Sequence, residues 1–318
     1  MAARSTGPAP RRAPDDASLH RGAALAAPLA DWYARSARDL PWRHDDCSPW
    51  GVLVSEVMLQ QTPVVRVLPV WTTWMERWPT PAELADAGPG EAVRAWGRLG
   101  YPRRALRLVD AASAIRDHHG GQVPSDEETL RSLPGIGEYT AAAVAAFAFG
   151  QRAVVVDTNI RRVQARAISG RALPAPSYTA AERALATALL PAGAAESVRW
   201  NIATMELGAL VCTARNPACG QCPLVDRCAW VAAGSPPDDG PPRRGQAWAG
   251  TDRQARGRIV QALRDADAPS PASRCSPHRG PPRCRRNAAW AACSRTGWPR
   301  GTTTPGTRCR PEVDAGAR

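Results

Sequence analysis

Two carboxylates stand out because each follows or interrupts apolar sequence. Glu56 is the one acid of Val52–Leu59, and Asp157 ends the apolar run 153–156. Burial raises the pKa of a carboxylic acid, which would suit Glu56 to general acid chemistry near neutral pH. The ordinary alternatives are a partly exposed glutamate on a surface helix and, for Asp157, the N-cap of the next helix. The local sequence leaves both alternatives open.

Four of the nine cysteines lie within 17 residues, in the pattern Cys-x6-Cys-x2-Cys-x5-Cys. Zinc ribbons usually carry two separated Cys-x2-Cys pairs, whereas this loop has one such pair. Irregular spacing of four thiolates is typical of iron–sulfur clusters. The loop is therefore predicted to hold a [4Fe–4S] cluster, with zinc as the alternative. The predicted metal ligands are Cys212, Cys219, Cys222 and Cys228.

A glycine-rich turn, Leu-Pro-Gly-Ile-Gly-Glu-Tyr-Thr at 133–140, joins two predicted helices. The first is expected to begin at the capping box Ser125–Glu128, and the second to start at Glu138. Glycines let the backbone approach a phosphate, and the free N–H groups of a helix N-terminus can bind it. This pattern predicts a helix-hairpin-helix that grips the DNA backbone, with an ordinary helix–helix turn as the alternative. The predicted DNA contacts are Gly135, Ile136, Gly137 and Thr140.

The elements that must position these groups are predicted to be helices. Apolar residues keep helical spacing through 84–99 and 106–115, and a second capping box at Thr179–Glu182 predicts another helix start. Only Ala153–Val156 has strand character, and it is too short to seed a sheet. The predicted fold class is all-α.

Composition narrows the partners of the chain. Its 318 residues allow two small domains, and its net charge is +12, with arginine supplying all 41 basic residues because lysine is absent. A basic chain suggests a nucleic-acid partner, although a preference for arginine codons explains the same excess. No apolar run approaches the ~20 residues of a membrane span, and no signal peptide opens the chain. The expected location is the cytoplasm, without membrane contact.

Taken in order, the helix-hairpin-helix, the Val-Asp pair about twenty residues later and the cysteine loop resemble the endonuclease III superfamily of DNA glycosylases. The resemblance spans about residues 25–230. It implies a two-lobed fold, with a six-helix domain and an iron–sulfur domain that clamp double-stranded DNA. Within the superfamily, four segments resemble the MutY-type adenine DNA glycosylases: Leu40–Arg43, Ser55–Thr62, Gly97–Tyr101 and Glu206–Cys212.

The resemblance implies hydrolysis of the N-glycosidic bond of adenine mispaired with 8-oxoguanine or guanine, by a monomer acting in base-excision repair. Glu56 would protonate the base, and Asp157, supported by Asn159, would stabilise the oxocarbenium-like sugar. Because the adenine must be flipped out of the duplex, the resemblance also implies a pocket and DNA contacts. The implied pocket residues are Trp42, Arg43 and Glu206, and the implied DNA contacts are Gln60, Gln61 and Tyr101.

Tyr139 completes the implied catalytic set and separates two kinds of enzyme. Bifunctional members of the superfamily carry at this position a catalytic lysine that forms a Schiff base, and arginine cannot replace it. The chain is therefore predicted to be monofunctional, without lyase activity. Two alternatives remain, a mismatch thymine or uracil glycosylase of the same superfamily and a catalytically inactive, cluster-containing DNA-binding protein.

The expected organisation changes character near residue 250. Residues 251–318 carry 14 arginines against 5 acids, and their composition after about residue 267 resembles G+C-rich DNA read in a shifted frame. The predicted parts are a disordered leader (1–18), an N-terminal helix region that packs with the iron–sulfur domain (19–50), the six-helix domain (51–153) with its helix-hairpin-helix (125–150), the iron–sulfur domain (154–234), a linker (235–250), the remnant of a C-terminal module (251–264) and a disordered tail (265–318).

Overall fold

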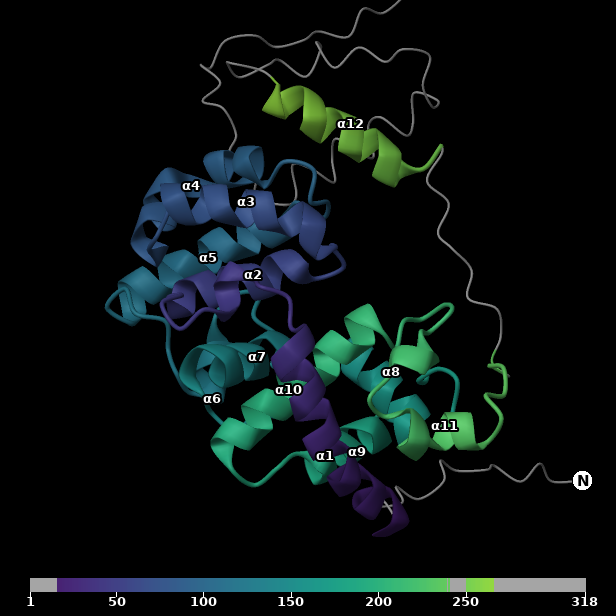
Figure 1. Cartoon of the computed structure of the whole chain (residues 1–318). Coiled ribbons are helices and arrows are strands. Elements are labelled where there is room, and N and C mark those ends of the chain that lie inside the picture. The colour runs from purple at the N-terminus through teal and green to yellow at the C-terminus, as the bar shows by residue number, and fades with distance from the viewer. Residues whose placement is uncertain (1–15, 239, 241–249, 266–318) are drawn as a thin grey trace, which may run out of the picture.

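The computed structural model describes residues 16–238, 240 and 250–265, and these residues form helices and turns with no strand (Figure 1). The predicted all-α fold class is confirmed. The apolar run at 153–156 is extended backbone between two helices and pairs with no strand in the described chain. The tail at 266–318, with its four cysteines, lies outside the described residues. No helix of the described chain combines the length and the apolar character that crossing a membrane requires.

The first lobe is built around a tryptophan-rich core. Trp74 is fully buried, and its ring meets those of Trp78 and Trp96 edge to face at 4.9 and 5.5 Å. Edge-to-face pairs add to the stabilisation that ring burial itself gives. The lobe contains α2 (Pro49–Leu59), α3 (Val64–Arg77), α4 (Pro81–Trp96), α5 (Arg103–His118), α6 (Glu127–Ser132) and α7 (Glu138–Phe149).

The second lobe combines the start of the described chain with its later helices. Leu25, Leu29 and Trp32 of the first helix are buried in one core cluster with Trp200 and Leu207, which lie on a helix far along the chain. Figure 1 shows this purple N-terminal helix against the green one. The predicted domain boundaries stay a prediction. The helices of this lobe are α1 (Asp16–Ser36), α8 (Thr158–Ala167), α9 (Ala180–Leu189), α10 (Ala194–Leu210) and α11 (Ala229–Ala232).

Four helix starts test the sequence prediction. The capping box at Thr179–Glu182 forms as expected, and α7 starts at Glu138. The predicted box at Ser125 is wrong by one residue, because the carboxylate of Asp126 accepts the Thr129 N–H at 2.8 Å and caps α6 instead. Serine and aspartate are comparable N-caps, so their adjacent positions gave no basis for choosing between them. Helix α1 starts at Asp16, inside the stretch 1–18 that was predicted to be a disordered leader.

A last helix, α12 (Asp252–Arg264), lies against the first lobe (Figure 1). Val260 is buried in the first core, and the Arg264 guanidinium donates to the Val93 carbonyl at 3.0 Å. Arg94 in turn donates to the Arg264 carbonyl at 2.7 Å. The segment predicted to be the remnant of a C-terminal module is thus a helix that contacts α4.

Candidate active site

Glu56 lies in the interior, on α2, with 5% of its surface exposed. Helix α2 packs against α7, whose buried residues at 140–146 are mostly alanine and let the two backbones come close. The Tyr139 hydroxyl at the start of α7 donates to Glu56 Oε2 at 2.8 Å. Burial raises the pKa of Glu56 to about 7, and the nearby charge of Asp157 adds to the increase, while Tyr139 and Arg43 oppose it. The carboxyl can therefore hold a proton near neutral pH, as a general acid must.

Asp157 performs the local role of an N-cap and also faces this interior. Its Oδ1 accepts the Ile160 N–H at 2.7 Å and so caps α8, while its Oδ2 accepts from the Asn159 amide at 2.7 Å. Burial raises the pKa of Asp157, and these donors, which favour the carboxylate, oppose the increase. The two interpretations of Asp157 are therefore compatible. The structure brings Glu56, Tyr139, Asp157 and Asn159 together, and their catalytic roles stay predictions.

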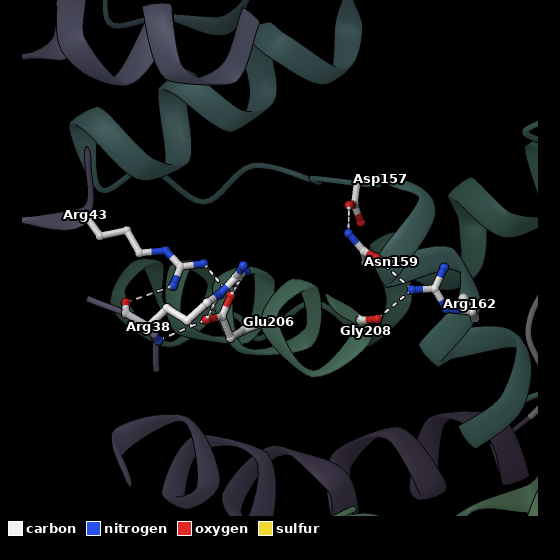
Figure 2. A network of polar contacts seen from close by, with 7 residues as sticks. All are labelled: Arg38, Arg43, Asp157, Asn159, Arg162, Glu206 and Gly208. Carbon is white, nitrogen blue, oxygen red and sulfur yellow. Dashed lines mark hydrogen bonds and ion pairs between the residues drawn. The ribbon is translucent and has the colours of Figure 1, made fainter. Parts of the chain in front are cut away.

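Arg162 was missed by the sequence prediction. It lies three residues after Asn159, one helical turn on, and donates to the Asn159 side-chain oxygen at 2.7 Å (Figure 2). The same guanidinium donates to the carbonyls of Gly208 and Cys212, both at 2.6 Å. A Cβ on Gly208 would lie 2.6 Å from that of Asn159, so α8 and α10 need a glycine there. Asp157 is thus connected by side-chain contacts to the first cysteine of the loop.

Glu206 is completely buried on α10 and accepts from two arginines (Figure 2). Arg38 donates its Nε, Nη2 and backbone N–H at 2.6–3.0 Å, and Arg43 donates Nη2 at 2.8 Å. Burial alone would raise the pKa of Glu206, but these hydrogen bonds outweigh it and lower that pKa to about 2. Trp42, predicted as a pocket residue with the other two, is buried with its ring 5.5 Å from that of Trp71. Arg38 was not predicted from the sequence.

The predicted DNA contacts lie in the turns after α2 and before α5 and around the start of α7, and Thr140 among them is buried. The Gln60 amide, just after α2, donates to the Thr140 hydroxyl of α7 at 3.2 Å. Tyr101 is 51% exposed, and Gln61 is also exposed. Both residues have a positive φ. In the hairpin, Gly135 has a φ of 78° and lies against Arg107, so a side chain there would clash. Gly137 faces open space, because a Cβ added there would meet no atom. The side chain of Ile136, between the two glycines, is buried.

The four predicted metal ligands line one open cavity, together with Arg166, Pro217 and Trp230. All four thiols are free. Within the described part of the chain, no three Cys, His, Asp or Glu side chains converge on a point where one metal ion would bind. A [4Fe–4S] cluster takes one thiolate on each of four irons, so it needs thiols spread around a cavity. Four thiols around one cavity fit such a cluster.

Iron is expected in the purified protein, at about four atoms per chain. Cys219→Ser should lower both iron content and soluble yield, because metal binding contributes directly to the folding of such loops. Cys47→Ser is the matched control, since Cys47 is a half-buried thiol outside the loop. Elemental analysis and absorbance spectra of the three proteins measure the difference. Stoichiometric zinc in protein made anaerobically with ample iron would contradict the assignment.

A two-lobed helical fold with a helix-hairpin-helix, a helix-capping aspartate and a four-cysteine loop defines a base-excision DNA glycosylase. Residues 54–188 match the family described as HhH-GPD superfamily base excision DNA repair protein, and residues 212–228 match the iron–sulfur binding domain of endonuclease III. A solved thermostable thymine-DNA glycosylase is similar at a TM-score of 0.61 and 26% identity, over 69% of this chain and 100% of that one. An endonuclease III–DNA complex shares the fold, with a TM-score of 0.58 and 22% identity over 68% and 97%.

The adenine DNA glycosylase of Mycobacterium tuberculosis (strain ATCC 25618 / H37Rv) is 56% identical over 241 residues, which cover 76% of this chain and 79% of that protein. The chain belongs to the adenine DNA glycosylase family. The predicted family and the [4Fe–4S] cofactor are thereby confirmed. The roles of individual residues stay predictions.

Proposed function

We propose that this enzyme hydrolyses the N-glycosidic bond of adenine mispaired with 8-oxoguanine or guanine in double-stranded DNA, acts as a monomer and leaves the strand intact. One observation carries the proposal. The buried Glu56 carboxyl, with a pKa of about 7, is held by Tyr139 and lies near the Asp157 carboxylate. Two carboxyl groups with different environments are what acid-assisted cleavage of a glycosidic bond requires. The relatives named adenine DNA glycosylase support adenine as the base.

In the proposed reaction, protonated Glu56 donates its proton to a ring nitrogen of the flipped adenine. The bond between the sugar C1′ and the base then breaks, and its electron pair leaves with the base. Asp157, which accepts hydrogen bonds from Ile160 and Asn159, stabilises the cationic sugar with its carboxylate form. Water attacks C1′ as its proton passes to the Glu56 carboxylate, which restores the acid. The Tyr139 hydroxyl holds the Glu56 carboxyl in one orientation through both proton transfers.

The proposed base pocket depends on the ion-paired Glu206. Glu206 accepts a hydrogen bond of 2.8 Å from Arg43 and so fixes this cation, which directly follows the buried Trp42 in the chain. A flipped base has polar edges and an aromatic face, and such pockets read them with hydrogen bonds and stacking. Trp42 and Arg43 offer both kinds of contact.

The direct test is single-turnover base release from duplexes that contain A:8-oxoguanine, A:G or T:G pairs. Release from the first two and not from T:G supports the proposal. Release from T:G alone would favour a thymine glycosylase, the function named for the solved relative. Duplex binding without release of any base would favour the inactive alternative.

Incubation with an A:8-oxoguanine duplex and borohydride is expected to trap no covalent protein–DNA adduct. A trapped adduct needs an amine that forms a Schiff base, and the chain has no lysine, with Tyr139 at the position implied for one. Denaturing gels before and after alkali measure the result, and the abasic strand should stay intact until alkali is added. Rapid cleavage by the enzyme would mean that another nucleophile, such as the N-terminal amine, is at work, and loss of this cleavage after blocking the N-terminus would identify that amine.

A further inference from the structure

Arg104 is a buried cation that the proposed reaction does not use. It lies on α5 with 7% of its surface exposed, and burial lowers its pKa to about 10. Its hydrogen-bond partners within the described residues are backbone carbonyls and one hydroxyl, with no carboxylate among them. Burying a charge without a counter-ion is costly. The contacts that offset this cost show what the side chain holds in place.

One arm of the guanidinium caps α2. Arg104 Nη1 donates to the carbonyls of Val57, Met58 and Gln60, at 2.9, 3.0 and 2.6 Å. These carbonyls belong to the last turn of α2 and the residue after it, where helical carbonyls lack partners in their own helix. A cation at this end also interacts favourably with the helix dipole. Arg104 therefore fixes the point at which the chain leaves α2.

The other arm holds a second turn. Arg104 Nη2 donates to the Thr62 hydroxyl at 2.9 Å and to the Gly100 carbonyl at 3.2 Å. The Thr62 hydroxyl donates to the Leu99 carbonyl at 3.2 Å, so the two turns also contact each other directly. The rings of Trp96 and Tyr101 lie 5.1 and 5.8 Å from the guanidinium carbon, within range of cation–π attraction.

Each clamped turn contains a residue in a strained backbone conformation. Gln61 has a φ of 55° and Tyr101 a φ of 47°, in the left-handed region that favours glycine. Such residues persist where the surrounding structure holds them, and they are concentrated at functional sites. Gln61 lies between the clamped Gln60 and Thr62, and Tyr101 directly follows the clamped Gly100.

We propose that Arg104 is a positioning residue that locks the turns 60–62 and 99–101 into one rigid element, so that Gln60, Gln61 and Tyr101 enter the DNA together. This inference rests on the proposed function for the contact with DNA. The clamp itself is a property of the free protein. The two parts can therefore be tested separately.

Hydrogen exchange in the free protein tests the clamp. Arg104→Gln removes the charge and the fork, and Arg104→Lys keeps the charge but loses the paired donors. Exchange of the Thr62 and Leu99 amides, whose partners are the carbonyls of Leu59 and Trp96, is expected to speed up roughly 10-fold or more in both variants. Amides of α10 should not change. Arg116→Lys, an exposed arginine on the same helix, is the matched control. Uniform acceleration, or none, would overturn the clamp.

A double-mutant cycle of Arg104 and Tyr101 tests whether the clamp acts when the enzyme enters DNA. With 2-aminopurine beside the target adenine, the fluorescence rise that reports base unstacking should be roughly 10-fold slower in Arg104→Lys than in the unmodified enzyme. If Arg104 acts by positioning Tyr101, then Tyr101→Ala and the double variant should be as slow as Arg104→Lys. Independent, additive losses would overturn the positioning role. If the unmodified enzyme releases no adenine from any duplex, the proposed function fails, and the exchange measurements still decide the clamp.

Discussion

Glu56→Gln is expected to slow single-turnover adenine release by at least about 10²–10⁴-fold, the range that general acid–base catalysis supplies. Glutamine keeps the shape of the side chain and can still accept the Tyr139 hydrogen bond, but it carries no transferable proton. Binding of the mismatched duplex should be nearly unchanged, so the loss should appear in the rate of the chemical step. Glu76→Gln, an exposed glutamate on α3, is the matched control. Turnover close to that of the unmodified enzyme would remove Glu56 from the acid role.

The same substitution should change two pH profiles. Because the acid must be protonated, adenine release is expected to fall as pH rises through about 7, the pKa of Glu56. Since burial raises this pKa above the ordinary 4.5, ionising Glu56 destabilises the fold, and the loss grows between these two pH values and is complete above 7. Glu56→Gln should therefore increase the free energy of unfolding at pH 8 by about 2–4 kcal/mol. Chemical denaturation at pH 5 and pH 8 checks the sign, with a smaller gain at pH 5.

Glu206→Gln is expected to cost about 3 kcal/mol of unfolding free energy at pH 7, at the lower end of the range for breaking a buried ion pair. The variant leaves two guanidiniums without their shared carboxylate, and the cost is moderated because the Arg38 side chain is 32% exposed. The pKa of Glu206 is lowered to about 2, so its stabilisation is fully present above the ordinary 4.5 and is lost as pH falls through 2. The difference between the two proteins should therefore shrink in acid.

Urea unfolding of the two proteins at pH 7 and at low pH measures the contribution of Glu206. Glu196→Gln, an exposed glutamate near the start of the same helix, should change stability by only a few tenths of a kcal/mol. A loss below about 1 kcal/mol for Glu206→Gln would show that solvent screens the pair as it screens surface ion pairs.

The sequence was sufficient where the signal is local. Turn glycines, capping residues and helical periodicity predicted an all-α chain, the start of α7 and the Thr179 capping box. The cysteine spacing favoured a cluster over zinc without any knowledge of the fold. Asp157 shows the limit of such reasoning, because the sequence offered a cap and a functional carboxylate as alternatives. In the structure, its two oxygens make different contacts, and the cap helps to hold the carboxylate in place.

The arginines could not be predicted, and the reason is physical. Arg38, Arg104 and Arg162 are distinguished by partners 42–168 residues away or by carbonyl groups that every residue carries. No pattern of side-chain types marks an arginine that caps a helix made elsewhere in the chain. The proposed clamp illustrates this point, since the resemblance implied Gln60, Gln61 and Tyr101 as DNA contacts but not the buried arginine that joins their turns.

The pairing of α1 with α10 has a consequence for the order in which the protein assembles on the ribosome. Leu25, Leu29 and Trp32 of α1 are buried by residues that come much later in the chain, from Val163 onward. With synthesis at ~5–20 residues per second, the roughly 160 residues between Ser36 and Ala194 take about 8–30 s to emerge. During that interval the apolar face of α1 lacks its α10 partner, while the first lobe already has most of its core. Nascent-chain chaperones and N-terminal fusions therefore meet α1 before the core that will bury it exists.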